Sequence, residues 1–175
     1  KQMLNTRNRI GSLLHNYSPV FFLFVSILNE IDFNNFGYKY FSFNFAYILI
    51  FYYSLKREDG IGYISIFIAG LFNDVINGMP MGISSLCYLF LCAFASYLRN
   101  ITLRPNIFKD WFFFLVTILI LNFVNYIYLI LFFKYEINYF DQMINIIFTF
   151  LLYFLFSHLF NFYEKLIVRR FYAGK

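Results

Sequence analysis

One acidic side chain, Asp74, occupies an otherwise uncharged stretch of the chain and is the first candidate for a chemical role. No other Asp, Glu, Lys or Arg occurs in residues 60–98. Glycines stand four residues before Asp74, at Gly70, and four and eight residues after it, at Gly78 and Gly82. An unpaired carboxylate in apolar surroundings is costly, so this acid needs a partner, a function or both.

The other side chains with reactive or metal-binding groups form no recognisable site. Cys87 and Cys92 are five residues apart in one apolar run, which places them about 140° apart around a helix. They cannot easily form a disulfide or share a metal ion. His15 and His158 have no matching set of ligands. Because no nucleophile–base pair, phosphate-binding loop or metal-ligand spacing occurs, we predict no enzyme activity, no cofactor and no metal.

The composition is that of an integral membrane protein. Apolar residues make up 61% of the 175 residues and charged residues only 13%, against roughly 25% charged in soluble domains. The net charge of +5 is spread between apolar runs instead of forming a basic patch, so we predict no nucleic-acid partner. The length suits one domain over residues 1–175.

Six apolar segments are predicted to cross the membrane as helices. A crossing takes about 20 residues, and only a helix or a closed barrel satisfies its own backbone groups in lipid. The first segment follows three basic residues, and we interpret it as an uncleaved signal anchor. The predicted spans are Ile10–Asn29, Tyr40–Leu55, Gly60–Asn77, Gly82–Leu98, Trp111–Phe133 and Met143–Tyr163.

Basic residues divide unevenly between the two sides of this arrangement. Twelve Lys and Arg lie at the amino end, in the loops at 56–59 and 99–110, and in the tail, whereas the other loops hold only Lys39 and Lys134. The positive-inside rule therefore predicts that both termini are cytoplasmic. The tail YEKLIVRRFY is expected to continue the last helix and to contact anionic membrane lipid. A docking site for a cytoplasmic partner is the alternative that we favour less.

Pro80 predicts a turn between the third and fourth spans. Proline does not fit inside a continuous helix, Gly78 suits a helix C-cap, and the serines that follow suit a helix start. We therefore expect a turn over residues 77–82 and place Asp74 in the last turns of the third span. Gly70, Gly78 and Gly82 are expected to let the two backbones meet.

Asp74 has two interpretations in this hairpin. In the first, its carboxylate caps the free N–H groups at the start of the fourth span and locks the hairpin, with Asn73, Asn77, Asn122 or Asn125 as further donors. In the second, it binds a proton, a cation or a substrate, since intramembrane acids are often functional. We favour the structural lock because no second intramembrane acid or base accompanies it.

Side-chain size separates the third and fourth spans from the fifth. Of the 39 residues in 60–98, 14 are Gly, Ala, Ser or Cys, whereas residues 111–133 contain none of these. Small residues allow close helix packing in lipid. We therefore predict that the third and fourth spans pack at the centre of the bundle or against a partner, and that the fifth faces lipid.

The run DGIGYISIFIAGLFNDVINGMPMGISSL resembles the central hairpin of the MreD family, small rod-shape-determining membrane proteins of bacteria. The G-x-x-x-D-x-x-x-G-x-x-x-G pattern of that family corresponds to Gly70, Asp74, Gly78 and Gly82, and Pro80 lies within it. The resemblance implies a multi-pass protein of the bacterial inner membrane. It also implies a six-helix fold like that of the substrate-binding subunits of energy-coupling-factor transporters.

The same resemblance implies a non-enzymatic subunit of the elongation machinery, a scaffold that helps to organise lateral peptidoglycan synthesis and maintain cell shape. Its implied partners are an MreC-like periplasmic protein, an MreB-like actin homologue and a RodA–penicillin-binding-protein synthase. One alternative is the vitamin-binding subunit of an energy-coupling-factor-type transporter, although SPVFFLFVSILNE in the first span lacks the A-x-x-x-A docking motif. An orphan membrane assembly factor is a third hypothesis.

Overall fold

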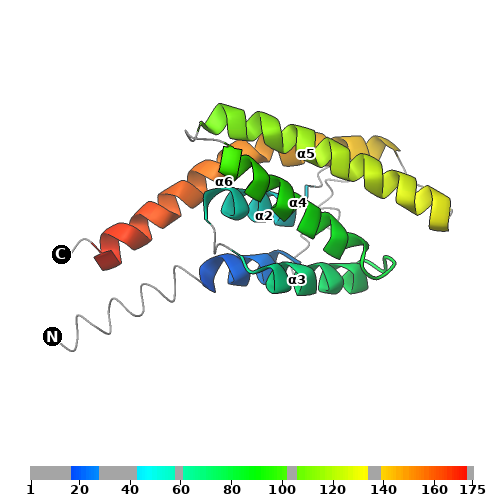
Figure 1. The fold of residues 1–175 in the computed structure, drawn as a ribbon, viewed down its shortest axis with the longest axis horizontal. Helices are drawn as coiled ribbons and strands as arrows, with labels where there is room; N and C mark the ends of the chain where they lie inside the picture. Colours follow the sequence, from blue (N-terminus) through cyan, green and yellow to red (C-terminus); the bar gives the residue numbers. More distant parts are fainter. Residues whose placement is uncertain (1–16, 28–42, 58–60, 102–105, 134–138, 173–175) are drawn as a thin grey trace, which may run out of the picture.

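The structure, a computed structural model, is helical in all the regular structure that it describes (Figure 1). It describes residues 17–27, 43–57, 61–101, 106–133 and 139–172. The helices are the segment Tyr17–Ile27, α2 (Phe45–Lys56), α3 (Tyr63–Ile76), α4 (Ile83–Ile101), α5 (Ile107–Tyr128) with its π-helical continuation η2 (Leu129–Phe133), and α6 (Tyr139–Tyr172).

Two of the described helices are long and apolar enough to cross a membrane, namely Ile107–Leu131 and Tyr139–Leu166. The helices Tyr17–Ile27, α2 and α3 are apolar but shorter. The 12 residues of α2 extend about 18 Å at 1.5 Å per residue, less than the roughly 30 Å of a hydrocarbon core. The predicted helices are therefore confirmed within the described residues, while six crossings and cytoplasmic termini stay a prediction.

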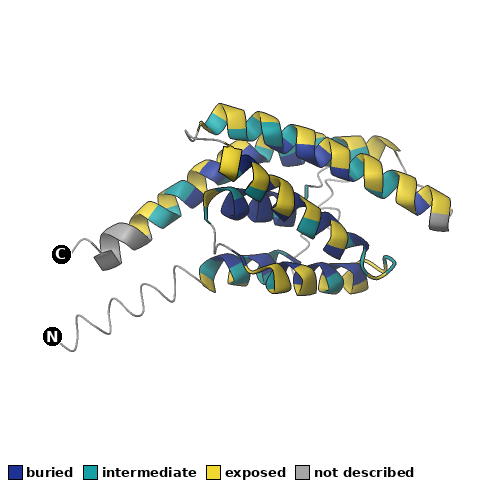
Figure 2. Cartoon of the chain, in the orientation of Figure 1, coloured by how far each residue is buried: buried dark blue, intermediate teal, exposed yellow. Residues whose placement is uncertain are grey.

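Helix α2 lies at the centre of the molecule. Every residue from Ala46 to Ser54 is buried, and α2 packs against both α4 and α6 (Figure 2). The sequence FAYILIFYYSLK is apolar on every face, as expected for a helix that is surrounded on all sides. At its amino end, the Asn44 side chain accepts a hydrogen bond from the Tyr47 N–H at 3.1 Å.

Helix α3 lies at the edge of the molecule, so the prediction that the third span packs at the centre of the bundle is wrong. Its alternative, packing against a partner, stays a prediction. The buried residues of α3, Ile66, Ala69, Gly70, Asn73 and Asp74, form one narrow face that meets α4. Most of its large apolar side chains are exposed. Of its small residues, Gly70 lies against the backbone of α4. Helix α4 does pack centrally, against α2, α3 and α5.

Helices α5 and α6 pair over one side of α2. Trp111 on α5 stacks on Phe150 of α6 with ring centroids 4.4 Å apart, and its indole N–H donates to the Phe150 carbonyl oxygen at 2.9 Å. Deeper in the bundle, the rings of Phe114 and Tyr153 stack at 4.3 Å, and Phe51 of α2 packs against both. The outer side of α5 is exposed, as predicted for the fifth span, although its contact with lipid stays a prediction.

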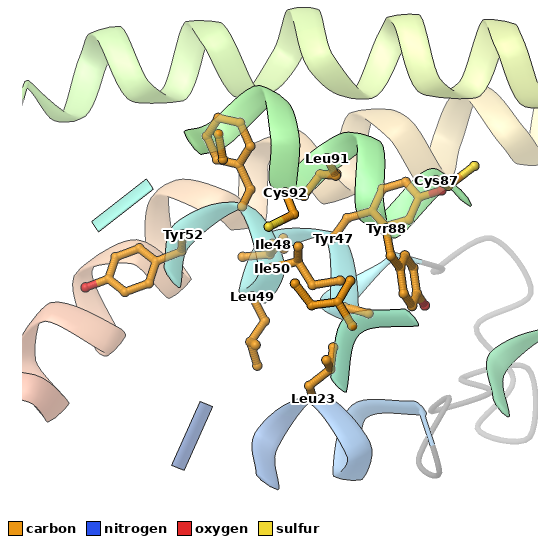
Figure 3. Close-up of a cluster of buried hydrophobic side chains, with 14 of the residues drawn as sticks. Leu23, Tyr47, Ile48, Leu49, Ile50, Tyr52, Cys87, Tyr88, Leu91 and Cys92 are labelled. Atoms are coloured by element: carbon orange, nitrogen blue, oxygen red, sulfur yellow. The ribbon is translucent and has the colours of Figure 1, made fainter. Parts of the chain in front are cut away.

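Both cysteines are free and buried on α4. The Ser54 hydroxyl of α2 donates to Cys92 Sγ at 3.2 Å, and the Tyr47 hydroxyl lies beside the Cys87 thiol (Figure 3). Leu23 of the first helical segment points toward α2 in the same view. The cysteines are thus small buried side chains that join α4 to α2.

Candidate functional site: the hairpin of α3 and α4

Helix α3 ends in a Schellman motif, a hydrogen-bonded turn that closes a helix with a left-handed residue. Gly78 takes this place with a φ of +61°. The Met79 N–H donates to the carbonyl oxygen of Asp74 at 2.9 Å, and the Gly78 N–H donates to that of Val75 at 3.4 Å. Glycine adopts this backbone conformation without the steric cost that a Cβ would add. The helix therefore ends at Ile76, one residue before the end of the predicted span Gly60–Asn77.

Helix α4 begins at Ile83, and Gly82 occupies the N-cap position before it. The Gly82 carbonyl oxygen accepts the Leu86 N–H at 2.9 Å, the first hydrogen bond of the helix. An N-cap residue usually provides a side-chain oxygen for the free N–H groups of the first turn. Glycine has no such oxygen, and its φ of +101° is one that other residues rarely adopt. The cap must therefore come from another part of the chain.

Asp74 provides that cap from the last turn of α3. The Gly82 N–H donates to Asp74 Oδ2 at 2.7 Å, and the Ser84 N–H donates to Asp74 Oδ1 at 2.9 Å. The side chain is fully buried. Hydrogen bonds to an ionised acceptor are stronger than neutral ones, and the amino end of a helix favours negative charge. This geometry is the capping arrangement that the first interpretation of Asp74 describes.

Two more side chains join the helices next to this cap. The Asn73 amide donates to Ser84 Oγ at 3.0 Å, and the Ser85 hydroxyl donates to the Phe67 carbonyl oxygen at 3.0 Å. Both serines thus bond to α3, although the sequence suggested them as caps of α4. Polar contacts of this kind hold helices together where apolar contact gives no preference over lipid.

Gly70 is the point of closest approach between the two backbones. A Cβ at this position would lie 2.4 Å from Cα and 2.5 Å from the backbone nitrogen of Ser85. A Cβ on Gly82 or Gly78 would meet nothing within 4 Å. The expectation that all three glycines bring the backbones together is therefore wrong for Gly78 and Gly82. These two are needed for their left-handed backbone conformation, and Gly70 alone is needed for space.

Pro80 lies in the turn between the helices, which covers residues 77–82 as predicted. Its carbonyl oxygen accepts the N–H of Ile83 at 3.5 Å. Asn122, suggested as a partner of Asp74, instead donates to the Ile118 carbonyl oxygen of its own helix at 2.8 Å. The Asn125 Oδ1 atom is buried without a hydrogen-bond partner in the part of the chain described.

Arg99 is an important residue whose role the sequence did not reveal. Its Nη1 group donates to the carbonyl oxygens of Ser54 at 2.9 Å and Arg57 at 2.8 Å. These oxygens lie at the carboxyl end of α2, where a cation is favoured. In the sequence Arg99 is one of twelve basic residues on the predicted cytoplasmic side. The signal that could have pointed to its role is its place near the end of an apolar helix, where basic side chains often bond to carbonyl oxygens.

A second contact at the same end of α2 involves Asn161 of α6. The Tyr52 hydroxyl donates to Asn161 Oδ1 at 3.0 Å, and the Lys56 ammonium group donates to the same oxygen. His158, one turn earlier on α6, contacts the Phe154 carbonyl oxygen at 3.1 Å, whereas His15 lies outside the described residues. The contacts of Tyr52 and Lys56 with Asn161 therefore join α2 to α6, whereas the His158 contact lies within α6.

The geometry of Asp74 suits an anionic cap better than a catalytic or transport site. Both carboxylate oxygens already accept backbone N–H groups. Within the described ranges, no group of three His, Cys, Asp or Glu side chains is placed to hold a metal ion. The four residues of the MreD-like pattern thus all shape the hairpin. Asp74 joins the two helix ends, and the glycines allow the close contact and the turn.

Comparisons with known proteins agree with this pattern. A model of the family described as rod shape-determining protein MreD matches residues 11–163, which is most of the chain. Searches of curated proteins and of solved structures return no match, so the likeness to energy-coupling-factor subunits stays a prediction. The family match gives no support to the vitamin-binding alternative. The chain therefore belongs to the MreD family of rod shape-determining membrane proteins.

Proposed function

We propose that this protein is a non-enzymatic subunit of the elongation machinery, which helps to organise lateral peptidoglycan synthesis in the bacterial inner membrane. The family match supports a role in rod shape. The partners implied by the resemblance are an MreC-like periplasmic protein, an MreB-like actin homologue and a RodA–penicillin-binding-protein synthase. We propose one six-helix domain over residues 1–175 with both ends in the cytoplasm, supported by the uneven distribution of Lys and Arg.

The hairpin of α3 and α4 is the proposed contact with the periplasmic partner. The observation that carries this proposal is the Asp74 cap, which ties the end of α3 to the start of α4. A turn held in this way offers a partner one conformation, so little ordering entropy is lost on binding. Met81 at the tip is 74% exposed, and Val75 and Ile76 beside it are also exposed.

The test is complementation of a rod-shaped bacterium that lacks its own MreD. Tagged protein is scored for membrane abundance, for recovery of the MreC-like partner, and for cell shape. Met81→Glu changes the exposed tip without touching the core, so it should accumulate normally, recover at least fivefold less partner and leave cells rounded. Lys109→Glu, an exposed site on the predicted cytoplasmic side, is the matched control.

Normal partner recovery and normal shape with Met81→Glu would contradict the hairpin as the contact site. Rescue of shape by an unrelated membrane protein expressed at the same level would contradict the role in elongation. Partner recovery that falls equally with Met81→Glu and Lys109→Glu would indicate a general effect of added negative charge, and it would also count against the hairpin.

A further inference from the structure

A groove lies between α5 and α6, away from the hairpin. Its volume is about 590 Å³. The described lining consists of five apolar side chains, two amides and two tyrosines, and it contains no charged group. Phe123 and Met143 on its two walls are each 64% exposed, so the groove is open to the surroundings of the protein.

The polar side chains of the groove keep free hydrogen-bond donors. Gln142 Nε2 donates to Asn122 Oδ1 at 3.4 Å, and Asn122 Nδ2 donates to the Ile118 carbonyl oxygen. Each amide nitrogen carries two N–H groups, so each has one N–H left over from these bonds. Tyr126 and Tyr139 share a hydrogen bond between their hydroxyl groups, which leaves one of the two hydroxyl hydrogens available.

The surroundings of this groove are set by its two helices. Helices α5 and α6 are each long and apolar enough to cross a membrane, so the groove between them opens toward lipid. This step rests on the membrane location in the proposed function and is independent of the partner proteins. Since the described lining carries no charge, the part of an occupant that enters the groove must be uncharged as well.

The size of the groove, about 590 Å³, suits a small flexible occupant. The volume lies within the usual range for a small-molecule site, about 300–1,000 Å³.

We propose that the groove binds one acyl chain of a diacyl phospholipid, with an ester carbonyl of that lipid accepting the spare N–H of Gln142. Apolar contact alone gives a lipid no preference for the groove over the bilayer. The preference comes from the shape of the groove and from this donor. A lipid bound in this way fills the space between the outer sides of α5 and α6.

The experiment uses the full chain in phosphatidylcholine vesicles that contain a trace of phosphatidylcholine with a photoactivatable diazirine in one acyl chain. After illumination, labelled positions are mapped by mass spectrometry. Labelling at Phe123 and Met143 should exceed labelling at Phe112 and Leu151 at least fivefold. The latter two are on the same helices, outside the groove lining, and they are 61% and 53% exposed, so exposure alone predicts nearly equal labelling.

Two variants make the test specific. Ile146→Trp fills the groove and should lower labelling of Phe123 to the level of Phe112. Gln142→Leu keeps the size of the side chain but removes the donor, and it should lower labelling at least threefold. Leu155→Trp, on α6 and outside the groove lining, is the control and should leave labelling unchanged. The thermal midpoint of each variant verifies that it is folded.

Equal labelling of groove and control positions would overturn the proposal, because it indicates ordinary boundary lipid. An unlabelled groove beside labelled controls would also overturn it, because another part of this chain or a second copy then occupies the site. Neither result bears on the proposed function, which is tested by partner recovery and by cell shape. If the unchanged protein fails to restore rod shape in the complementation experiment but its groove is still labelled, the proposed function is contradicted and the lipid site is not.

Discussion

The Asp74 carboxylate lies between two helix ends of opposite partial charge. It belongs to the last turn of α3, where the helix dipole disfavours an anion, and it bonds to the first turn of α4, where the dipole favours one. Its two charge-assisted hydrogen bonds to Gly82 and Ser84 offset the cost of burial. The Asp74 side chain thus joins the end of α3 to the start of α4 and holds the turn closed.

Replacement of Asp74 tests whether capping explains this residue. Asp74→Ala leaves the N–H groups of Gly82 and Ser84 without an acceptor, and each unsatisfied buried group costs about 1–3 kcal/mol. Asp74→Asn keeps one acceptor oxygen and should lose roughly half as much. The thermal midpoint in detergent should thus fall most for Asp74→Ala, less for Asp74→Asn, and not at all for Met81→Ala, an exposed control.

A role for the charge itself would give a different pattern. Asp74→Asn would then accumulate normally in the membrane yet fail to restore cell shape, as completely as Asp74→Ala fails. That result would reject the structural lock in favour of a titrating or ion-binding acid.

Three glycine-to-alanine changes separate space from backbone conformation. Gly70→Ala places a Cβ against the backbone of Ser85, so the hairpin must open, at a cost of about 3 kcal/mol or more. In Gly82→Ala the new Cβ meets no atom within 4 Å, but alanine must adopt the unfavourable positive φ, at a cost of about 1–2 kcal/mol. Gly62, with a φ of −61° and its nearest contact at 3.9 Å, is the control. The thermal midpoint should fall most for Gly70→Ala, less for Gly82→Ala and least for Gly62→Ala. Equal effects at Gly70 and Gly62 would contradict the close approach of the two backbones.

At the level of helices, α4 is fixed near both ends by charged side chains. Asp74 caps its amino end, and Arg99 in its last turn reaches the carboxyl end of α2. One helix is thus tied to α3 at one end and to α2 at the other, each time through a helix terminus whose partial charge complements the side chain.

Substitution of Arg99 tests the contact with α2. Arg99→Met removes both hydrogen bonds and should cost about 1–3 kcal/mol, whereas Arg99→Lys keeps the charge but not the planar fork and should recover part of the loss. Lys109→Met, an exposed basic residue on α5, should leave the thermal midpoint unchanged. An effect of Lys109→Met as large as that of Arg99→Met would show that charge near the membrane surface, and not the cap, matters.

The positions of the helices and of the turn were predicted from the sequence more accurately than the identity of the central helix. Pro80 and Gly78 predicted the turn between α3 and α4 because turns need particular backbone conformations. The central position of α2 was missed because lipid is as apolar as a protein core, so buried and lipid-facing helices have similar compositions. Small residues did not distinguish a central position for α3 from one at the edge, since Gly70 gives close contact with α4 in either position. The Arg99 cap depends on where α2 ends relative to α4, which no local pattern encodes.

At the level of the whole molecule, the predicted topology places three loops outside the cytoplasm, at residues 30–39, 77–82 and 134–142. Single cysteines at Asn35 and Asn138, introduced after Cys87 and Cys92 are replaced by alanine, should react with an impermeant thiol reagent on intact cells made permeable only in the outer membrane. A cysteine at Asn5 should not react until the inner membrane is opened.

Reaction of the Asn5 position on intact cells would reverse the orientation or change the number of spans. Protection of Asn138 together with reaction of Asn35 would place the connection between α5 and α6 on the cytoplasmic side, which would reject six spans with both ends inside.

The burial of α2 also has a consequence for how the protein is made. Its neighbours α4 and α6 lie later in the chain, and α6 begins at Tyr139. At about 5–20 residues per second, a ribosome that has finished α2 needs several more seconds to reach α6. During that time the aromatic side chains of α2 must be covered by lipid or by the insertion machinery. Ribosome stalling or premature termination before α6 would therefore leave a half-covered helix for membrane proteases to recognise.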